Sequence, residues 1–238
     1  MKPIDVSVGV IGGSGIYELA PVVDRRGPVS VCDVAGQRVA FLNRHGAGHR
    51  IPPHAVDYCG NMRALADLGV RVVVATFACG SLRPELGPGA LVVPDQLIDR
   101  TRRRDTFFDV FEDGPRHTPF ADPYDEVVRR ALLNAAPEAV DGGTVVVIDG
   151  PRFATRAESR WYRAAGATLI NMTQYPEAVL ARELGLAYGA IGLVTDHDIG
   201  IEDRPDVAPV TQEAAFAMFA AHLPRLREVV LAAAVGLA

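Results

Sequence analysis

The sequence lacks the features that mark secreted, membrane-spanning and zinc-binding proteins. Its three cysteines, Cys32, Cys59 and Cys79, form no Cys-x-x-Cys pair, which indicates a reducing compartment and no zinc site. No apolar run reaches the ~18–20 residues that a membrane helix needs. The apolar run near the N-terminus is too short for a signal peptide. We therefore expect a cytoplasmic protein with no membrane partner.

The sequence also lacks an excess of positive charge. Its formal net charge is −5, which argues against a nucleic-acid partner but leaves room for a local anion site. The chain has 238 residues, of which 49% are hydrophobic. This is enough for one substantial core, and we expect residues 1–238 to form a single α/β domain.

Short apolar runs rich in β-branched residues alternate with helical patterns. The runs lie at 6–12, 38–43, 70–77, 90–98, 143–150, 167–173 and 187–195. The helical patterns lie at 54–69, 122–136, 155–166, 175–185 and 211–235. Most runs are apolar throughout, which predicts strands buried on both faces of a parallel or mixed sheet in an α/β sandwich. Pro224 is expected to kink or split the last helix, and residues 101–120 form a long irregular connection.

The glycine-rich turn at 9–17, GVIGGSGIY, lacks the fingerprints of two nucleotide-binding folds. No Gly-Lys-Ser/Thr follows, so it is not a P-loop, and Glu18 stands where a dinucleotide-binding turn has its last glycine. Its backbone N–H groups could still face an anion. A tight structural turn and a phosphate cradle both remain open for it.

Polar or small residues follow several predicted strands at the point where each strand ends. Ligands of open α/β sheets lie outside the carboxyl ends of the strands. An arginine and a histidine in a glycine-rich loop suit a tetrahedral oxyanion, although an exposed basic loop is the alternative. Each hydroxyl could instead serve a local turn or helix cap. Together these strand ends predict an anion pocket formed by Ser14, Arg44, His45, Ala78 and Thr173.

Three further residues could contact a planar ligand. Phe153 lies between a strand and a helix, where it could stack on a ring or fill the core. Asp196 and Asp198 end a buried strand, and no other cluster has the spacing to complete a metal site with them. Side chains at i and i+2 of an extended chain point the same way. Two carboxylates in one pocket raise the pKa of one of them, which can then donate a hydrogen bond while the other accepts.

These motifs, in this order, resemble the trimeric purine nucleoside phosphorylase family, and within it the 5′-methylthioadenosine phosphorylase branch. The resemblance covers residues 6–200 and is carried by GVIGGSGIY, NRHGAGHRIPPHAVDYCGNMRAL, ACGSLRPELGPGALVVPDQLIDRT, HTPFADPY, DGPRFATRAES, NMTQYPEAVLARELGL and LVTDHDIG. It implies the nucleoside phosphorylase fold, a three-layer sandwich with a mixed, partly barrel-like central sheet. It also implies reversible phosphorolysis without a metal or organic cofactor. Inorganic phosphate, the co-substrate, attacks C1′ of a purine nucleoside and releases the base and a ribose 1-phosphate.

The resemblance implies roles for individual residues. The five residues of the anion pocket would bind phosphate, Ala78 through its backbone N–H. Met172 would pack on the ribose and Phe153 would cover the base. Asp196 would meet the proton demand at N7, and Asp198 would accept from an exocyclic amino group. His117, in the long connection, would reach into a neighbour's 5′ pocket within a homotrimer.

Other positions are expected to determine which base and which 5′ group the protein binds. Family members that read 6-oxopurines are expected to have an amide in place of Asp196 and a glutamate in place of Ala154, so this sequence predicts adenine nucleosides. The 5′ pocket would be lined by Val207, Pro209 and Gln212, where relatives have aliphatics. Gln212 suits a polar 5′ group, unless the alignment is shifted by one turn. The expected substrate is 5′-methylthioadenosine, with adenosine or 5′-halo-5′-deoxyadenosine as the alternative and an inosine-type nucleoside as a weaker one.

Other features leave further alternatives. Phe77 stands where relatives have a small or polar residue, and either weakens phosphate binding or points into the core. A hydrolase acting on the same nucleosides, a non-catalytic nucleotide-binding module and a dehydrogenase are the competing functions. The set of phosphate residues argues against the first two, and the incomplete glycine fingerprint argues against the third.

Overall fold

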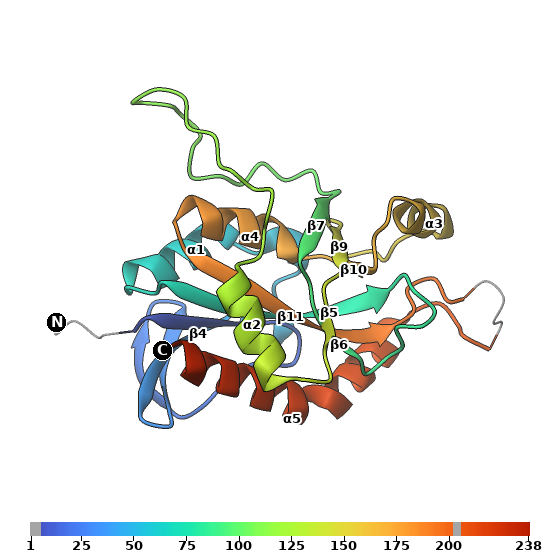
Figure 1. Ribbon diagram of the computed structural model, residues 1–238, viewed down its shortest axis with the longest axis horizontal. Coiled ribbons are helices and arrows are strands. Elements are labelled where there is room, and N and C mark those ends of the chain that lie inside the picture. Colours follow the sequence, from blue (N-terminus) through green and yellow to red (C-terminus); the bar gives the residue numbers. More distant parts are fainter. Residues whose placement is uncertain (1–5, 202–205) are drawn as a thin grey trace.

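The computed structural model describes residues 6–201 and 206–238. Within them, one eleven-stranded mixed sheet is flanked by helices (Figure 1), which confirms the predicted α/β fold. The strands are β1 (Val8–Gly12), β2 (Val22–Arg26), β3 (Val29–Val34), β4 (Gln37–Asn43), β5 (Val72–Ser81), β6 (Leu91–Val93), β7 (Gln96–Asp99), β8 (Val140–Asp141), β9 (Thr144–Val147), β10 (Leu169–Asn171) and β11 (Ala187–Asp196). The α-helices are α1 (Tyr58–Asp67), α2 (Glu126–Ala135), α3 (Arg156–Ala164), α4 (Gln174–Glu183) and α5 (Gln212–Leu237), and two 3₁₀ turns are η1 (Ala47–His49) and η2 (Pro53–Ala55).

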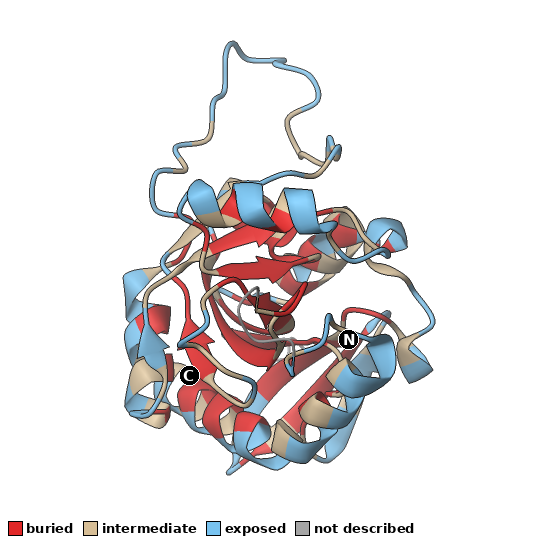
Figure 2. Cartoon of the chain, turned by 90° about the vertical axis from the view of Figure 1, so that its right-hand side faces the viewer, coloured by how far each residue is buried: buried red, intermediate tan, exposed pale blue. Residues whose placement is uncertain are grey.

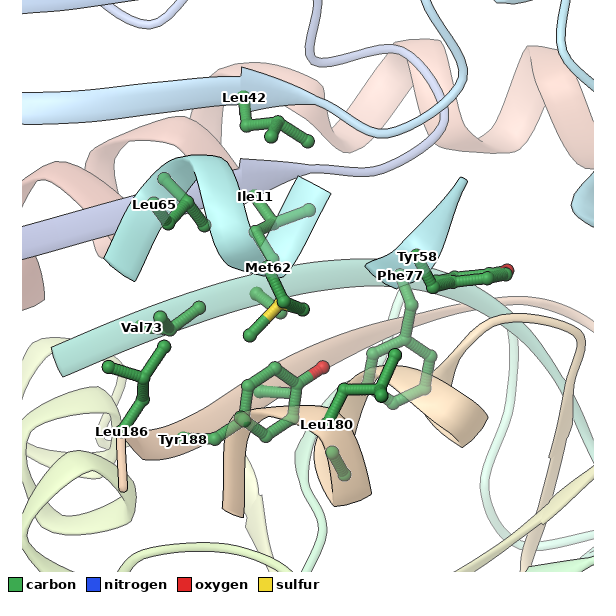
Figure 3. Close-up of a cluster of buried hydrophobic side chains, with 14 of the residues drawn as sticks. Ile11, Leu42, Tyr58, Met62, Leu65, Val73, Phe77, Leu180, Leu186 and Tyr188 are labelled. Carbon is green, nitrogen blue, oxygen red and sulfur yellow. The ribbon is translucent and has the colours of Figure 1, made fainter. Parts of the chain in front are cut away.

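The sheet runs in the order β2-β3-β4-β1-β5-β10-β9-β7, and β11 pairs with both β5 and β6. Helices α1 and α4 cover one face, where residues such as Met62 and Leu180 are fully buried against the strands (Figure 3). Helices α2 and α5 cover the other face through residues such as Leu132 and Val230. Burying each such side chain contributes about 1.5–3 kcal/mol. The sheet is accordingly the most buried part of the molecule (Figure 2).

The long strand β5 creates an opening in the sheet. One edge of β5 pairs with β11 from Val72 to Gly80. The other edge pairs with β1 only as far as Ala75 and with β10 only from Gly80. Between these two pairings, the stretch 76–79 has no neighbouring strand on that edge among the described residues. This gap places the polar backbone groups of β5 beside the ends of several other strands.

Several sequence predictions need correction. The run 90–98 is two strands, β6 and β7, because it is interrupted at Pro94; β6 pairs with β11 and β8, whereas β7 pairs with β9. Strands β2, β3 and β8 were not predicted, and β2 is a mostly exposed edge strand that lacks a continuous apolar run. Helix α5 is one helix through Pro224, not two, because buried residues on both sides of the proline hold it against the sheet and α2.

As predicted, the segment 101–120 is a long irregular connection. The segment 101–120 contains no helix or strand and extends from the body of the protein as an exposed arm (Figures 1 and 2). No helix of the described residues has the length and apolar character needed to cross a membrane.

Candidate active site

A cavity of about 530 Å³ lies beyond the ends of β1, β4, β5, β10 and β11. It is walled by these strand ends, the loop before α3 and the start of α5. The gap along β5 therefore brings together residues that are far apart in the sequence. The predicted site residues that line it are Ser14, Arg44, His45, Ala78, Phe153, Met172, Thr173, Asp196, Asp198 and Gln212.

Arg44 is held by a buried carboxylate behind the cavity. Its Nε and Nη2 donate to the two carboxylate oxygens of Glu177 at 2.7 and 2.6 Å, and its Nη1 donates to the Thr76 carbonyl at 2.9 Å. The Tyr188 hydroxyl also donates to Glu177, at 2.8 Å. Burial lowers the pKa of Arg44, but the charge and hydrogen bonds of Glu177 outweigh burial and raise it. Arg44 is therefore a fixed cation whose charge is largely balanced inside the protein.

The glycine-rich turn lies directly over Arg44. A Cβ on Gly13 would stand 2.5 Å from the Thr76 carbonyl oxygen and 3.0 Å from Arg44 Nη1, so no side chain fits there. Gly15 has a φ of 83°, a conformation that L-residues with side chains rarely adopt. The turn thus brings Ser14 to the cavity wall beside the arginine, while its glycines allow the close approach.

His45 is fixed by a backbone carbonyl. Its Nδ1 lies 2.9 Å from the carbonyl oxygen of Ile51, which can only accept, so Nδ1 carries the proton. Burial, and then the charge of Arg44, lowers the pKa of His45 to about 3. Its ring stacks on His49 at 4.2 Å between centroids, and Phe216 of α5 meets His49 edge-on at 5.4 Å. His45 is therefore a neutral imidazole in an ordered stack.

Asn171, at the end of β10, joins two predicted phosphate residues. Its side-chain nitrogen donates to the Ala78 carbonyl at 2.9 Å, and its side-chain oxygen accepts from Thr173 N at 2.7 Å and from Gln174 N at 2.8 Å. In a strand, the N–H and C=O of one residue point to the same edge. Because the Ala78 carbonyl faces Asn171, the Ala78 N–H also points to the open edge of β5.

Asp196 and Asp198 both line the cavity, but the expected extended geometry is wrong. Strand β11 ends at Asp196, and Asp198 lies in a following turn with a φ of 52°. The N–H of Asp198 donates to Asp196 Oδ1 at 2.8 Å, and the Thr195 hydroxyl donates to Asp196 Oδ2 at 2.7 Å. The turn arises because the side chain of Asp196 caps the chain that follows it. The intervening His197 does not belong to the cavity lining.

The two carboxyl groups differ in their partners. Asp198 is 2% exposed, and its Oδ2 has no hydrogen-bond partner among the described residues. Burial raises the pKa of Asp198 to about 6 against a hydrogen bond from Ser159, and the charge of Asp196 adds to the rise. Burial also raises the pKa of Asp196, whereas the hydrogen bonds from Thr195 and Asp198 oppose that rise. Asp198 is thus the group with an unsatisfied oxygen beside the cavity.

The remaining cavity walls are apolar or adaptable. Phe153 is 41% exposed at the cavity, in the loop before α3, and Met172 lines the wall beside it. The Phe77 ring lies in the core near Tyr58 (Figure 3) and forms part of the cavity wall. Gln212, the first residue of α5, lines the cavity, as do Ala215 and Phe216 one turn later.

Three of the residues discussed for the 5′ pocket lie outside the cavity lining of the described chain. His117 is exposed on the arm, where its ring meets Phe111 edge-on at 5.5 Å. Val207 is half-buried and Pro209 is exposed, and neither is part of the lining. Ala154, in contrast, belongs to the wall near Phe153.

Sequence reasoning missed three polar residues that hold the site together. They are Glu177 behind Arg44, Asn171 between Ala78 and Thr173, and Ser159 behind Asp198. A buried arginine requires a counter-ion, so the lone acid in the apolar pattern YPEAVLA was a usable signal for Glu177. Ser159 had no comparable signal, because its placement depends on the capping box of Thr155 and Glu158 that starts α3.

A mixed sheet flanked by helices, opening into this cavity, is the architecture of pentosyl-transferring phosphorylases. Residues 7–230 match the phosphorylase superfamily, and the chain belongs to that superfamily. It is 49% identical to S-methyl-5′-thioadenosine phosphorylase of Mycolicibacterium smegmatis, over 95% of this chain and 89% of the relative. It is 48% identical to purine nucleoside phosphorylase of Streptomyces coelicolor, over 98% and 90%. Methylthioadenosine phosphorylase from Schistosoma mansoni in complex with adenine superimposes with a TM-score of 0.86 at 35% identity, over 97% and 91%.

Proposed function

We propose that this protein cleaves the N-glycosidic bond of 5′-methylthioadenosine, or a related 5′-modified adenine nucleoside, with inorganic phosphate. The products are adenine and a 5-substituted ribose 1-phosphate. The observation that carries the proposal is the pairing, in one cavity, of anion donors at one end with two carboxyl groups at the other. The similarity to phosphorylases named for S-methyl-5′-thioadenosine supports the substrate.

In the proposed reaction, a phosphate oxygen attacks C1′ as the C1′–N9 bond breaks. Positive charge builds on the ribose, and the adjacent phosphate stabilises it. Ser14, Thr173 and the Ala78 N–H would bind the phosphate together with Arg44, which Glu177 keeps oriented. Neither a metal ion nor an organic cofactor is required for these steps.

The leaving purine accumulates negative charge, which a proton at N7 relieves. Asp196 and Asp198 would share that proton, and burial raises the pKa of both groups, which makes a proton easier to hold in the pair than on an exposed carboxylate. The remaining carboxylate oxygen would accept from the 6-amino group of adenine. A 6-oxo group would face that acceptor with another acceptor, at a cost of about 1–3 kcal/mol. Phe153 would cover the base, and Met172 would pack against the ribose.

An adenine-release assay with and without phosphate tests this function. We expect release from 5′-methylthioadenosine that rises with phosphate and saturates. Equal release without phosphate would identify a hydrolase instead. Tight nucleoside binding with no release under either condition would identify a binding module.

Gln212 favours a second candidate substrate. Its amide lines the cavity at the rim formed by α5, where a thioether would offer it no strong hydrogen bond. Adenosine or a 5′-halo-5′-deoxyadenosine carries a more polar 5′ group. Comparison of kcat/KM across the three nucleosides decides between the candidates.

We also propose that the protein acts as a homotrimer in which His117 reaches a neighbour's 5′ pocket. The support is that His117 lies on the exposed arm, away from the cavity of its own chain. Val207 would approach the same pocket in the assembled state. Light scattering gives the oligomeric state, and a trimer whose His117→Ala variant keeps its KM for every 5′-substituted nucleoside would contradict this role.

A further inference from the structure

The phosphate end of the cavity contains an acceptor where an anion site would ordinarily place a donor. The Ile51 carbonyl fixes the proton of His45 on Nδ1, so Nε2 carries a lone pair. No hydrogen bond joins Nε2 to any described residue, and His45 lines the cavity. The stack with His49 limits rotation of the ring. The open position of His45 is therefore a hydrogen-bond acceptor on a residue that lines the cavity.

We propose that His45 makes the phosphate site select tetrahedral anions that carry a proton. Hydrogen phosphate and hydrogen arsenate have an O–H group that can donate to Nε2. Sulfate has the same charge and nearly the same shape at neutral pH but carries no proton. It would place an oxygen lone pair against the Nε2 lone pair. This inference rests on the proposed phosphate site and concerns which anions that site accepts.

The charges around His45 do not themselves distinguish hydrogen phosphate from sulfate. Burial and the charge of Arg44 lower the pKa of His45, so the free site holds the neutral ring. Glu177 balances the charge of Arg44, so this arginine does not attract every dianion alike. Arg50 also lines the cavity, but it is exposed, so solvent screens its charge. The titratable and charged groups facing His45 and this pair are Arg44 and His49 on the same segment, Glu177 on α4, Tyr58 on α1 and Tyr188 on β11. A mismatched buried polar pair costs roughly 10–100-fold in affinity.

Sulfate can bind well only if His45 takes up a proton from solution. Sulfate affinity should therefore rise about tenfold for each unit of falling pH, in proportion to the protonated fraction of the ring. Phosphate affinity should lack this dependence near neutrality, because hydrogen phosphate brings its own proton. The two anions thus differ in linked proton uptake as well as in affinity.

Isothermal titration calorimetry on the protein tests the proposal at a pH above the second pKa of phosphate, where hydrogen phosphate predominates. Phosphate, arsenate and sulfate are titrated in two buffers of different ionisation enthalpy. We expect phosphate and arsenate to bind with little linked proton uptake. Sulfate should bind about 10–100-fold more weakly, which is the cost of the mismatched pair with the neutral ring. Sulfate that binds as tightly as phosphate without taking up a proton would overturn the proposal. Failure of phosphate itself to bind would instead count against the proposed function.

A variant at position 45 tests the Nε2 acceptor separately from the rest of the phosphate site. Glutamine at position 45 offers an N–H donor, so His45→Gln should reduce the preference for phosphate over sulfate by about tenfold and abolish sulfate-linked proton uptake. His222→Gln is the matched control, because His222 Nδ1 also lies 3.0 Å from a carbonyl, that of Met218, but outside the cavity lining. An unchanged anion preference in the folded His45→Gln variant would contradict the proposal. If that variant does not fold, the wild-type titrations still decide.

Discussion

The two ends of the cavity differ in how their buried charged groups are hydrogen-bonded. At the phosphate end, Glu177 and the Thr76 carbonyl accept from Nε, Nη1 and Nη2 of Arg44. At the base end, Asp198 is equally buried, yet its Oδ2 has no partner among the described residues. A satisfied buried charge fixes geometry, whereas an unsatisfied one favours a ligand that supplies the missing proton or donor. The comparison indicates that the phosphate end is preorganised and that the base end carries the selectivity for the nucleobase.

The largest effect is expected when a carboxyl group at the base end is replaced by a neutral group. Asp198→Asn keeps the shape but removes one of the two carboxyl groups that would share the proton for N7, so kcat/KM for adenine release should fall by about 10²–10⁴-fold. Steady-state kinetics with saturating phosphate measure the loss. Asp24→Asn, on the exposed edge strand β2, is the control and should leave the rate unchanged. A loss below tenfold for Asp198→Asn would mean that this carboxyl does not serve the leaving base.

Removing the counter-ion tests the phosphate end. Glu177→Gln leaves the Arg44 charge uncompensated in a buried position, which should cost about 3–5 kcal/mol of unfolding free energy. Denaturant unfolding measures the change. Glu138→Gln removes a pair with Arg225 in which both side chains are about half exposed, so it should cost less than about 1 kcal/mol. Equal losses in the two variants would show that the Arg44 pair does not hold the fold at this end.

The raised pKa of Asp198 predicts a pH dependence of stability. Its pKa is about 6 in the folded protein and 3.8 ordinarily, so between these values the folded state binds more protons than the unfolded state. Stability should therefore fall as pH rises from about 4 to about 6, by up to about 3 kcal/mol from this group. Unfolding curves across that range check the slope. The slope should be smaller in Asp198→Asn, and an identical slope would assign the effect to other groups.

Another test of the cavity concerns Gln212, which lines it at the start of α5. Gln212→Val replaces an amide with an aliphatic side chain at the start of α5. The ratio of kcat/KM for 5′-methylthioadenosine to that for adenosine should rise about 10-fold, since an aliphatic side chain packs against the thioether where the amide does not. Glu213→Val, at the neighbouring position, lies outside the cavity lining and should leave the ratio unchanged. A constant ratio for both variants would show that Gln212 does not face the 5′ group.

The sequence was sufficient for the residues that end strands. Ser14, Arg44 and Thr173 follow buried strands and line the cavity, whereas Ala78 lies within β5, three residues before its end. Strands β1, β4 and β5 run parallel, and β10 is antiparallel to β5. The helices were also predictable, because their apolar spacing and caps are local.

Features that depend on distant partners could not be predicted. The pairing of Glu177 with Arg44 joins residues 133 positions apart, and Asn171 reaches Ala78 across 93. Strands β6 and β7 were merged because periodicity does not show which strand each one pairs with. The turn at Asp198 was missed because it depends on a hydrogen bond from its own N–H to Asp196. Tertiary contacts override the local pattern in the first two cases, whereas the turn depends on a local side-chain hydrogen bond.

The central claim is that Asp196 and Asp198 read the 6-amino group of the base. It is tested most directly by kcat/KM for 5′-methylthioadenosine and 5′-methylthioinosine at saturating phosphate, since the two nucleosides differ only at the 6-position edge of the purine. The account predicts about 10–100-fold higher kcat/KM for 5′-methylthioadenosine. Equal values, or a preference for 5′-methylthioinosine, would contradict it.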